Sequence, residues 1–198
     1  MTTTKDWTGN SVSWNKIGGY TAHAIGEREE NDYYATDPKA VEKLLAVETF
    51  REDIWEPACG EGHLSKKMIE LGKDVYSSDL IYRGYLYTSI QDFLEIDFFS
   101  EDRDIITNPP YKFAERFIRQ ALKLTSGKVA MLLRIQFLEG QARQKLYKEF
   151  PPKVVYVFSK RVDCAKNGDF KKNVGGAVCY AWFVWEVGYK GETIIKWI

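Results

Sequence analysis

The stretch Asp53-Ile54-Trp55-Glu56-Pro57-Ala58-Cys59-Gly60-Glu61-Gly62-His63 decides the fold of this 198-residue chain. Its first four residues are typical of a short strand, and residues 63–71 have the apolar spacing of a helix that ends at Gly72. Glycines between a strand and a helix let the backbone approach a ligand closely at the mouth of a parallel sheet. The stretch therefore predicts a strand, a glycine-containing ligand loop and a helix, in that order.

The segments on either side alternate between strand and helix patterns. Helices are expected after the Asp37-Pro38 start signal up to residue 45, and over residues 113–124 and 138–149. Further strands are expected over residues 74–79, 90–93 (a strand or a turn), 103–107, 128–135, 154–158 and 178–187. The alternation predicts an α/β domain with a single, seven-stranded, mostly parallel sheet, whose last two strands pair as an antiparallel hairpin at its edge.

The composition is that of a globular protein, with 44% apolar and 28% charged residues. It excludes disordered and low-complexity classes. No apolar run approaches the roughly 20 residues that span a bilayer, and the N-terminus lacks a signal-peptide pattern. The three cysteines are too scattered for a disulfide framework or a C-x-x-C metal site. We therefore expect a cytoplasmic protein with no metal site and no membrane partner.

The chain divides into an irregular N-terminal arm, residues 1–32, and one domain, residues 33–198. Residues 1–99 carry 10 basic and 18 acidic side chains, a balance of −8, and residues 100–198 carry 18 and 10, a balance of +8. The first half would suit a cationic ligand and the second half a polyanion. The halves can also interleave in space, in which case no charged patch forms.

Two acids characterise the ligand of the glycine loop. Glu56 begins the loop, which makes it poorly suited to a pyrophosphate and better suited to a cationic or amino-bearing cofactor. Asp79 ends the next expected strand, where a carboxylate binds ribose hydroxyls in nucleoside-binding folds. Neither G-x-G-x-x-G nor G-K-[ST] is present, which disfavours a dinucleotide or a nucleoside triphosphate.

A second motif, Asn108-Pro109-Pro110-Tyr111, follows the strand expected over residues 103–107. Two prolines end a strand by themselves, so a plain turn is one interpretation. The glycine loop is expected on an adjacent strand of the same sheet. A catalytic role is therefore the interpretation that we favour.

With these residues, the chain resembles the S-adenosylmethionine-dependent amino-methyltransferases, and most closely the small phage and prophage-type DNA N6-adenine methyltransferases. The matching segments are residues 31–38, 56–62, Asp79, Asp92-Phe93, 108–111 and the late strand 180–185. The resemblance implies a Rossmann-like class I methyltransferase domain over residues 33–198, with S-adenosylmethionine as cofactor and adenine in double-stranded DNA, flipped out of the helix, as substrate.

The resemblance also implies the catalytic residues, which are Asn108, Pro109, Pro110 and Tyr111. In that family the Asn108 side-chain oxygen and the Pro109 carbonyl accept hydrogens from the adenine amino group, whose lone pair is otherwise delocalised into the ring. Tyr111 stacks on the flipped base. No covalent intermediate is required, and for Cys59 we favour a turn-packing role over a nucleophilic one.

The cofactor contacts that the resemblance implies fall into two groups. Asp79 would bind the ribose, and Asp92 with the backbone of Phe93 would bind the adenine ring, with Asp97 as a rival for Asp92. The methionine part would lie among the remaining residues, which are Tyr34, Thr36, Glu56, Pro57, Ala58, Cys59, Gly60, Gly62 and Asn108.

Nucleic-acid contacts are expected mainly from the loop between the last two expected strands, residues 159–176. Together with Tyr111, its candidate contact residues are Lys160, Arg161, Lys166, Phe170, Lys171 and Lys172. A solvated loop without a partner is the alternative, and Arg116, Arg119 and Lys123 are expected on the solvent face of their helix.

The substrate keeps several alternatives open. We expect a relaxed or short recognition sequence, because no segment for a separate recognition domain follows the last strands. RNA adenine is the strongest rival substrate, and a protein glutamine side chain and a catalytically silent binding module are weaker ones. No protein partner is required for the chemistry.

Overall fold

The computed structural model describes residues 35–99, 102–162, 164–165 and 178–198. They belong to one compact unit, Tyr33–Ile198. The expected N-terminal arm, residues 1–32, lies outside the described residues, as does Tyr34. Among the described residues, no helix has both the length and the apolar character needed to cross a membrane.

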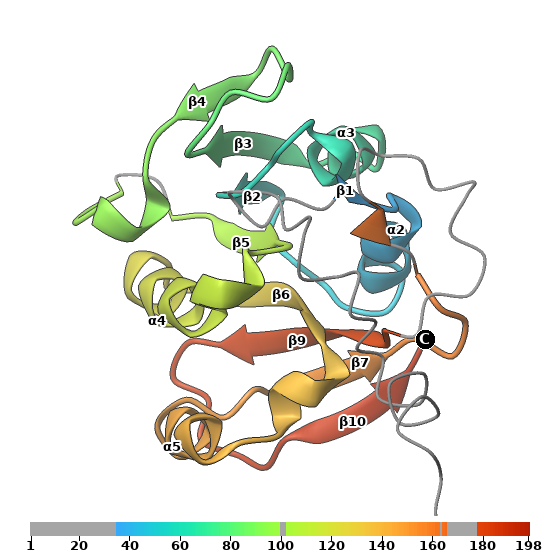
Figure 1. Ribbon diagram of the computed structural model, residues 1–198, viewed down its shortest axis with the longest axis vertical. Coiled ribbons are helices and arrows are strands. Elements are labelled where there is room, and N and C mark those ends of the chain that lie inside the picture. Colours follow the sequence, from blue (N-terminus) through green and yellow to red (C-terminus); the bar gives the residue numbers. More distant parts are fainter. Residues whose placement is uncertain (1–34, 100–101, 163, 166–177) are drawn as a thin grey trace, which may run out of the picture. The chain divides into compact units, whose positions relative to one another are not determined.

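Eight strands form the main sheet, in the order β10-β7-β9-β6-β5-β2-β3-β4 (Figure 1). Their bounds are Asp53–Glu56 (β2), Asp74–Asp79 (β3), Thr88–Ile90 (β4), Asp104–Thr107 (β5), Lys128–Arg134 (β6), Val154–Val157 (β7), Tyr180–Glu186 (β9) and Ile194–Trp197 (β10). All neighbours are parallel except at β9, which is antiparallel to both β6 and β7. The prediction of an α/β domain with a mostly parallel sheet is confirmed.

Three details of the predicted sheet are corrected. The sheet has eight strands and not seven, because β10 pairs with β7. The predicted antiparallel pair, β7 and β9, forms, but β10 lies outside it and occupies the edge. The third strand covers Thr88–Ile90 instead of residues 90–93, because Phe93–Glu95 forms a short 3-10 turn (η2) capped by the carboxylate of Asp92.

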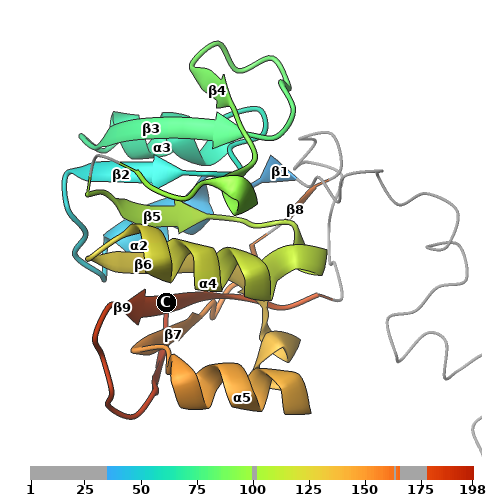
Figure 2. The same cartoon turned by 90° about the vertical axis from the view of Figure 1, so that its left-hand side faces the viewer.

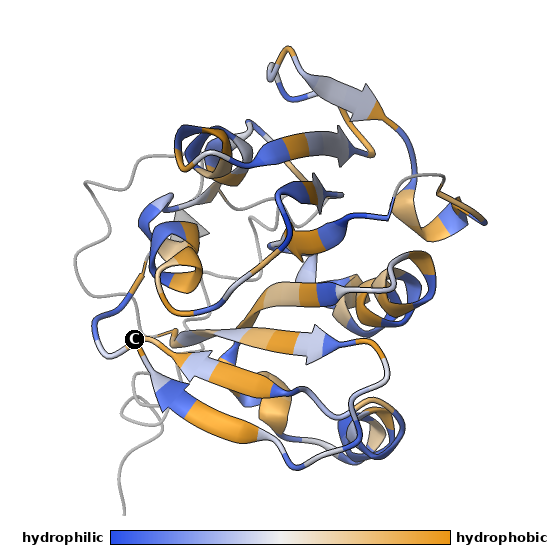
Figure 3. Ribbon diagram, turned by 180° about the vertical axis from the view of Figure 1, so that it is seen from behind, coloured by the Kyte–Doolittle hydropathy of each residue, from blue (hydrophilic) through white to orange (hydrophobic). Residues whose placement is uncertain are grey.

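Helices cover both faces of the sheet. Their bounds are Lys39–Leu45 (α2), His63–Glu70 (α3), Ala114–Leu124 (α4) and Gln141–Glu149 (α5). In Figure 2, α4 and α5 lie in front of the sheet, and α2 and α3 lie behind it. Strand residues alternate between the two faces: Ile106 packs with α2 and α3, whereas Ile105 packs with α4. Figure 3 shows the apolar residues concentrated on the strands and on one side of each helix.

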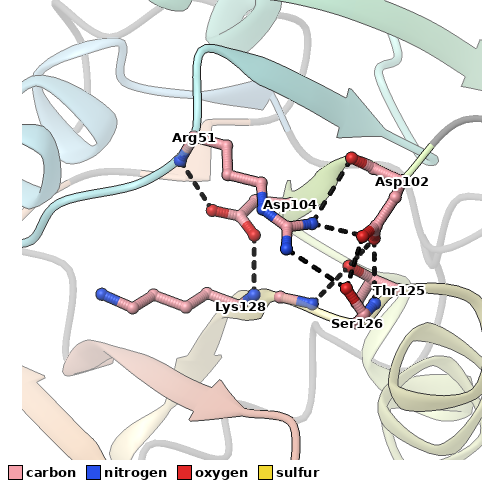
Figure 4. A network of polar contacts seen from close by, with 7 residues as sticks. Arg51, Asp102, Asp104, Thr125, Ser126 and Lys128 are labelled. Carbon is pink, nitrogen blue, oxygen red and sulfur yellow. Dashed lines mark hydrogen bonds and ion pairs between the residues drawn. The ribbon is translucent and has the colours of Figure 1, made fainter.

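A polar network pins the amino ends of the central strands (Figure 4). The buried carboxylate of Asp104 accepts from the backbone N–H groups of Arg51, at 2.8 Å, and Lys128, at 2.7 Å. Asp102 binds Ser126 and forms an ion pair with Arg51 at 2.8 Å. The hydrogen bonds from Ser126, with the Arg51 charge, lower the pKa of Asp102 to about 2. This network ties β2, β5 and β6 together at the ends opposite to the glycine loop.

Candidate active site

The carboxyl ends of three adjacent strands bring the two sequence motifs to one edge of the sheet. β2 pairs in parallel with β3 on one side and with β5 on the other, and the three arrowheads lie at the same side of the sheet in Figure 2. The glycine loop follows β2, Asp79 ends β3, and Asn108 follows β5. A parallel α/β sheet binds its ligands at this edge.

The glycine loop is held to β3 by backbone hydrogen bonds. Gly60 and Gly62 adopt left-handed conformations, with φ of +56° and +75°. The N–H of Cys59 donates to the carbonyl of Ser78 at 3.0 Å, and the N–H of Gly60 donates to the Asp79 carboxylate at 2.8 Å. The second oxygen of Asp79 accepts from the N–H of Ile81 at 3.1 Å. Asp79 is therefore fixed in place while remaining partly exposed.

The ring of Tyr85 leaves no room for a side chain at Gly62, a contact that the sequence does not predict. A Cβ atom at Gly62 would lie 2.5 Å from the ring of Tyr85, which is itself 5% exposed. The ammonium group of Lys66 lies 5.2 Å from the centroid of the same ring. The close approach at Gly62 is thus made by Tyr85, whereas the prediction assigned it to a ligand.

Glu56 does not supply the charge expected of it. Its side chain is 2% exposed and accepts a hydrogen bond from Ser65, whose hydroxyl lies 2.6 Å from that of Ser77. Burial, with a smaller contribution from the charge of Asp79, raises the pKa of Glu56 to about 8. The carboxyl group is therefore neutral at pH 7, and it joins β2 to α3 and β3 instead of presenting a negative charge to a ligand.

The rest of the loop packs inward. Pro57 is buried and Ala58 half-buried. Cys59 is 5% exposed with its sulfur 3.3 Å from the Thr88 hydroxyl, and burial raises the pKa of its thiol to about 12. A thiol that stays protonated at neutral pH is a poor nucleophile. These features agree with the turn-packing role favoured for Cys59.

The residues expected at an adenine ring lie beyond β4. The Phe93 side chain is buried against Trp55, at 5.2 Å between ring centroids, and its carbonyl accepts from the side chain of Gln120 at 3.1 Å. Asp92 is exposed, and its carboxylate accepts from the N–H of Leu94 at 2.9 Å. The rival Asp97 lies 3.7 Å from the ammonium group of Lys123, on the surface of α4.

The side chain of Asn108 is oriented by Thr36. Its amide nitrogen donates to the Thr36 hydroxyl at 2.8 Å, and Thr36 is 4% exposed. Thr36 belongs to β1 (Ala35–Thr36), which pairs antiparallel with β8 (Cys164–Ala165). Because the nitrogen is committed to Thr36, the amide oxygen is held on the opposite side of the group. The structure thus places Thr36 against Asn108, the first residue of the Asn108-Pro109-Pro110-Tyr111 motif, a contact that the sequence did not predict.

Tyr111 forms a cluster with two other side chains, those of Tyr180 and Arg134. It begins a short 3-10 turn, η3 (Tyr111–Phe113), after the buried Pro109 and the extended Pro110. Its ring stacks with that of Tyr180 at 6.0 Å, and the guanidinium of Arg134 lies 5.1 Å from its centroid. Neither neighbour was predicted from the sequence, because both come from strands far from residue 111 in the chain.

The expected nucleic-acid contacts are only partly within the described residues. Lys160 and Arg161 are exposed. The remaining members of that set lie outside the described residues: Lys166, Phe170, Lys171 and Lys172. On α4, Arg119 is paired with Glu115 and Glu149, as expected for a solvent face. Within the described part of the chain, no group of three or more His, Cys, Asp or Glu side chains could hold a metal ion.

No known family profile matches this sequence, and no curated protein matches it. Solved structures share its fold. A protein from Listeria monocytogenes described as a class I S-adenosylmethionine-dependent methyltransferase is 14% identical, with a TM-score of 0.59 over 92% of this chain and 71% of that one. A type I restriction enzyme modification subunit from Vibrio vulnificus is 15% identical, with a TM-score of 0.54 over 91% of this chain and 49% of that one.

A third similar structure, described as an RNA methyltransferase from Pyrococcus horikoshii, is 13% identical, with a TM-score of 0.51 over 76% of this chain and 81% of that one. The TM-scores of 0.51–0.59 show a shared fold, whereas identities of 13–15% leave the substrate open. The described domain therefore has the Rossmann-like class I methyltransferase fold, as predicted.

Proposed function

We propose that residues 33–198 transfer the methyl group of S-adenosylmethionine to the N6 amino group of adenine in DNA, with relaxed or short sequence specificity. The observation that carries this proposal is the placement of Asn108. Its amide is oriented by Thr36 at 2.8 Å, directly after β5 and beside the strand that carries the glycine loop. In this proposal the Asn108 amide oxygen accepts from the substrate nitrogen, next to the loop that would hold the cofactor.

The residues at the carboxyl ends of β2 and β3 fit this cofactor. Bound S-adenosylmethionine supplies an electrophilic methyl group on a sulfonium. Asp79 is held by two backbone donors and stays partly exposed, which suits it to accept the ribose hydroxyls. The adjacent Leu80 is 56% exposed and offers an apolar surface to a purine ring. Asp92 and the backbone of Phe93 would bind the adenine edge, and Ala58 and Gly60 the methionine part.

Asn108 and Pro109 activate the substrate nitrogen. The amide oxygen of Asn108 and the carbonyl of Pro109 would accept hydrogen bonds from the two amino hydrogens, which favours the pyramidal form with a localised lone pair. As that lone pair bonds to the methyl carbon in line, the sulfonium S–CH3 bond would break, S-adenosylhomocysteine would leave, and one amino proton would pass to solvent. The rigid proline backbone holds its carbonyl before the reaction begins, so little reorganisation is needed in the transition state. Tyr111 stacks on the base and fixes its plane. No covalent intermediate with the enzyme is formed, consistent with the protonated thiol of Cys59.

The fold similarities support a nucleic-acid substrate without choosing between DNA and RNA. One similar structure is described as a restriction-enzyme modification subunit, and another is described as an RNA methyltransferase. The exposed Lys160 and Arg161 provide cations in the loop expected to contact phosphates. RNA adenine is therefore the second candidate substrate, and a protein glutamine side chain would use the same acceptor pair.

The substrate is tested by methyl transfer from labelled S-adenosylmethionine to double-stranded DNA, single-stranded DNA and total RNA in parallel. The products are digested to nucleosides and identified by mass. N6-methyladenine from DNA is the expected result. Label confined to RNA would retain the chemistry and replace the substrate. Label in none of the three, with the cofactor bound, would contradict a nucleic-acid substrate.

A further inference from the structure

Arg134 and Tyr180 meet at the ring that the proposed function assigns to the target base. Arg134 is the last residue of β6, Tyr180 is the first of β9, and the two are directly opposed in the antiparallel register. Both contact Tyr111, at 5.1 Å from the Arg134 guanidinium and 6.0 Å from the Tyr180 ring, each measured to the Tyr111 centroid. Two strands therefore bring side chains to one aromatic residue of η3.

The guanidinium of Arg134 is suited to hold an anion while it contacts Tyr111. It lies 5.1 Å from the centroid of the ring, and a guanidinium in a cation–π contact keeps N–H donors for an anion. Arg134 is exposed, and among the described residues no carboxylate lies within ion-pair distance of it. By contrast, Arg119 on α4 is held by Glu115 and Glu149. Arg134 thus carries a charge that the described part of the chain does not compensate.

The same surface continues along η3 and the first turn of α4. Phe113 is 36% exposed, and its ring lies 5.4 Å from the ammonium group of Lys112 and 5.7 Å from the guanidinium of Arg116. Aromatic rings interleaved with cations are the surface that single-stranded or extruded nucleotides bind, since bases stack on the rings and phosphates pair with the cations. An acidic protein surface would use the cations but not the exposed rings.

We infer that Arg134 binds a phosphate of the extruded nucleotide and holds Tyr111 in place for stacking, with Lys112 and Arg116 along the same strand of substrate. This inference rests on the proposed function, because it takes Tyr111 as the base-stacking residue. It adds a nucleic-acid contact on the domain itself, independent of the loop of residues 159–176. The ligand is a phosphodiester next to an unstacked base, in DNA or in RNA.

The test compares Arg134→Gln, Arg134→Lys and the control Lys123→Gln with the unaltered chain. Lys123 is an exposed cation in the last turn of α4, and its ammonium group lies 3.7 Å from the carboxylate of Asp97. Binding of a fluorescent double-stranded oligonucleotide, and of RNA of the same sequence, is measured at several salt concentrations in the presence of S-adenosylhomocysteine. Affinity for S-adenosylmethionine is measured separately by calorimetry.

We expect Arg134→Gln to weaken oligonucleotide binding about tenfold and to reduce the magnitude of the log–log salt slope by about 0.9 on duplex DNA, the amount for one phosphate. Its affinity for S-adenosylmethionine should be unchanged, which also shows that the variant is folded. Arg134→Lys should restore the salt slope but keep a raised Kd for the oligonucleotide, because lysine keeps the charge but not the planar fork of guanidinium donors. Lys123→Gln should behave like the unaltered chain.

The two proposals fail in different ways. If the unaltered chain binds oligonucleotides but Arg134→Gln keeps its affinity and salt slope, the role of Arg134 is refuted and the proposed function stands. If Lys123→Gln loses as much as Arg134→Gln, the effect is one of overall charge and the inference is also refuted. If the unaltered chain binds the cofactor but neither DNA nor RNA, the proposed function itself is contradicted.

Discussion

Replacing Thr36 by valine should slow methyl transfer without weakening cofactor binding. Valine has the shape of threonine but removes the oxygen that accepts from the Asn108 amide at 2.8 Å. Thr36 is 4% exposed, so water does not readily replace the lost acceptor. A buried donor left without its partner costs about 1–3 kcal/mol. If the amide rotates to relieve this cost, its oxygen leaves the position that the substrate amino group requires.

This cost corresponds to a decrease in kcat of about 5- to 150-fold. Steady-state kinetics with labelled S-adenosylmethionine measure kcat, and calorimetry measures the cofactor Kd. The matched control is Thr36→Ser, which keeps the hydroxyl and should retain most of the activity. The reasoning is refuted if Thr36→Val turns over at the original rate, or if Thr36→Ser is equally slow. A parallel loss of cofactor affinity would return Thr36 to the cofactor site.

Three further predictions concern stability, measured as the free energy of unfolding in urea. Gly72 has φ of +84° and nothing within 4 Å of an added Cβ, so Gly72→Ala should lower the free energy of unfolding by about 1–2 kcal/mol through backbone strain alone. Gly62→Ala should lower it by more, because its Cβ would lie 2.5 Å from Tyr85. Equal losses for the two variants would contradict the packing argument. Folded Glu56 keeps its proton up to about pH 8, whereas the unfolded side chain loses it near 4.5. Its contribution is therefore complete below pH 4.5 and falls by about 1.4 kcal/mol per pH unit as the pH rises towards 8. Glu56→Gln should flatten this decline, and an unchanged profile would show that Glu56 ionises normally. Asp104→Asn should cost about 1–3 kcal/mol, because one of the two backbone N–H groups loses its acceptor, and an unaltered unfolding midpoint would count against that role.

Strands with buried apolar side chains can be predicted from the sequence. A strand with exposed side chains, held mainly by backbone pairing, cannot. The near-continuous apolar run of β6, Lys128–Arg134, predicts a central strand, and the structure buries it on both faces. β10 has all four residues exposed and is defined by its parallel pairing with β7. An exposed strand has no burial pattern that periodicity can detect. Its partner becomes apparent only when the sheet order is known.

The site shows the same division. That Asn108 and the glycine loop lie near each other can be predicted, because both motifs follow the carboxyl ends of parallel strands that the α/β pattern predicts. The contact between Thr36 and Asn108 joins residues 72 positions apart, and no local pattern encodes it. The sequence suggests a charged Glu56. Its neutral state depends on burial beside α3 and β3, which the sequence does not show. Long-range packing, which sequence spacing does not contain, decides these roles.

The central claim is that Asn108 activates the N6 amino group of adenine for direct methyl transfer. It is tested most directly by comparing the unaltered chain with Asn108→Ala on unmethylated double-stranded DNA, with labelled S-adenosylmethionine and mass identification of the labelled nucleoside. Calorimetry on both proteins gives the affinity for the cofactor. The account predicts N6-methyladenine with the unaltered chain, and no product with Asn108→Ala at nearly unchanged cofactor affinity. Label on a different nucleoside, or turnover that survives in Asn108→Ala, would contradict it.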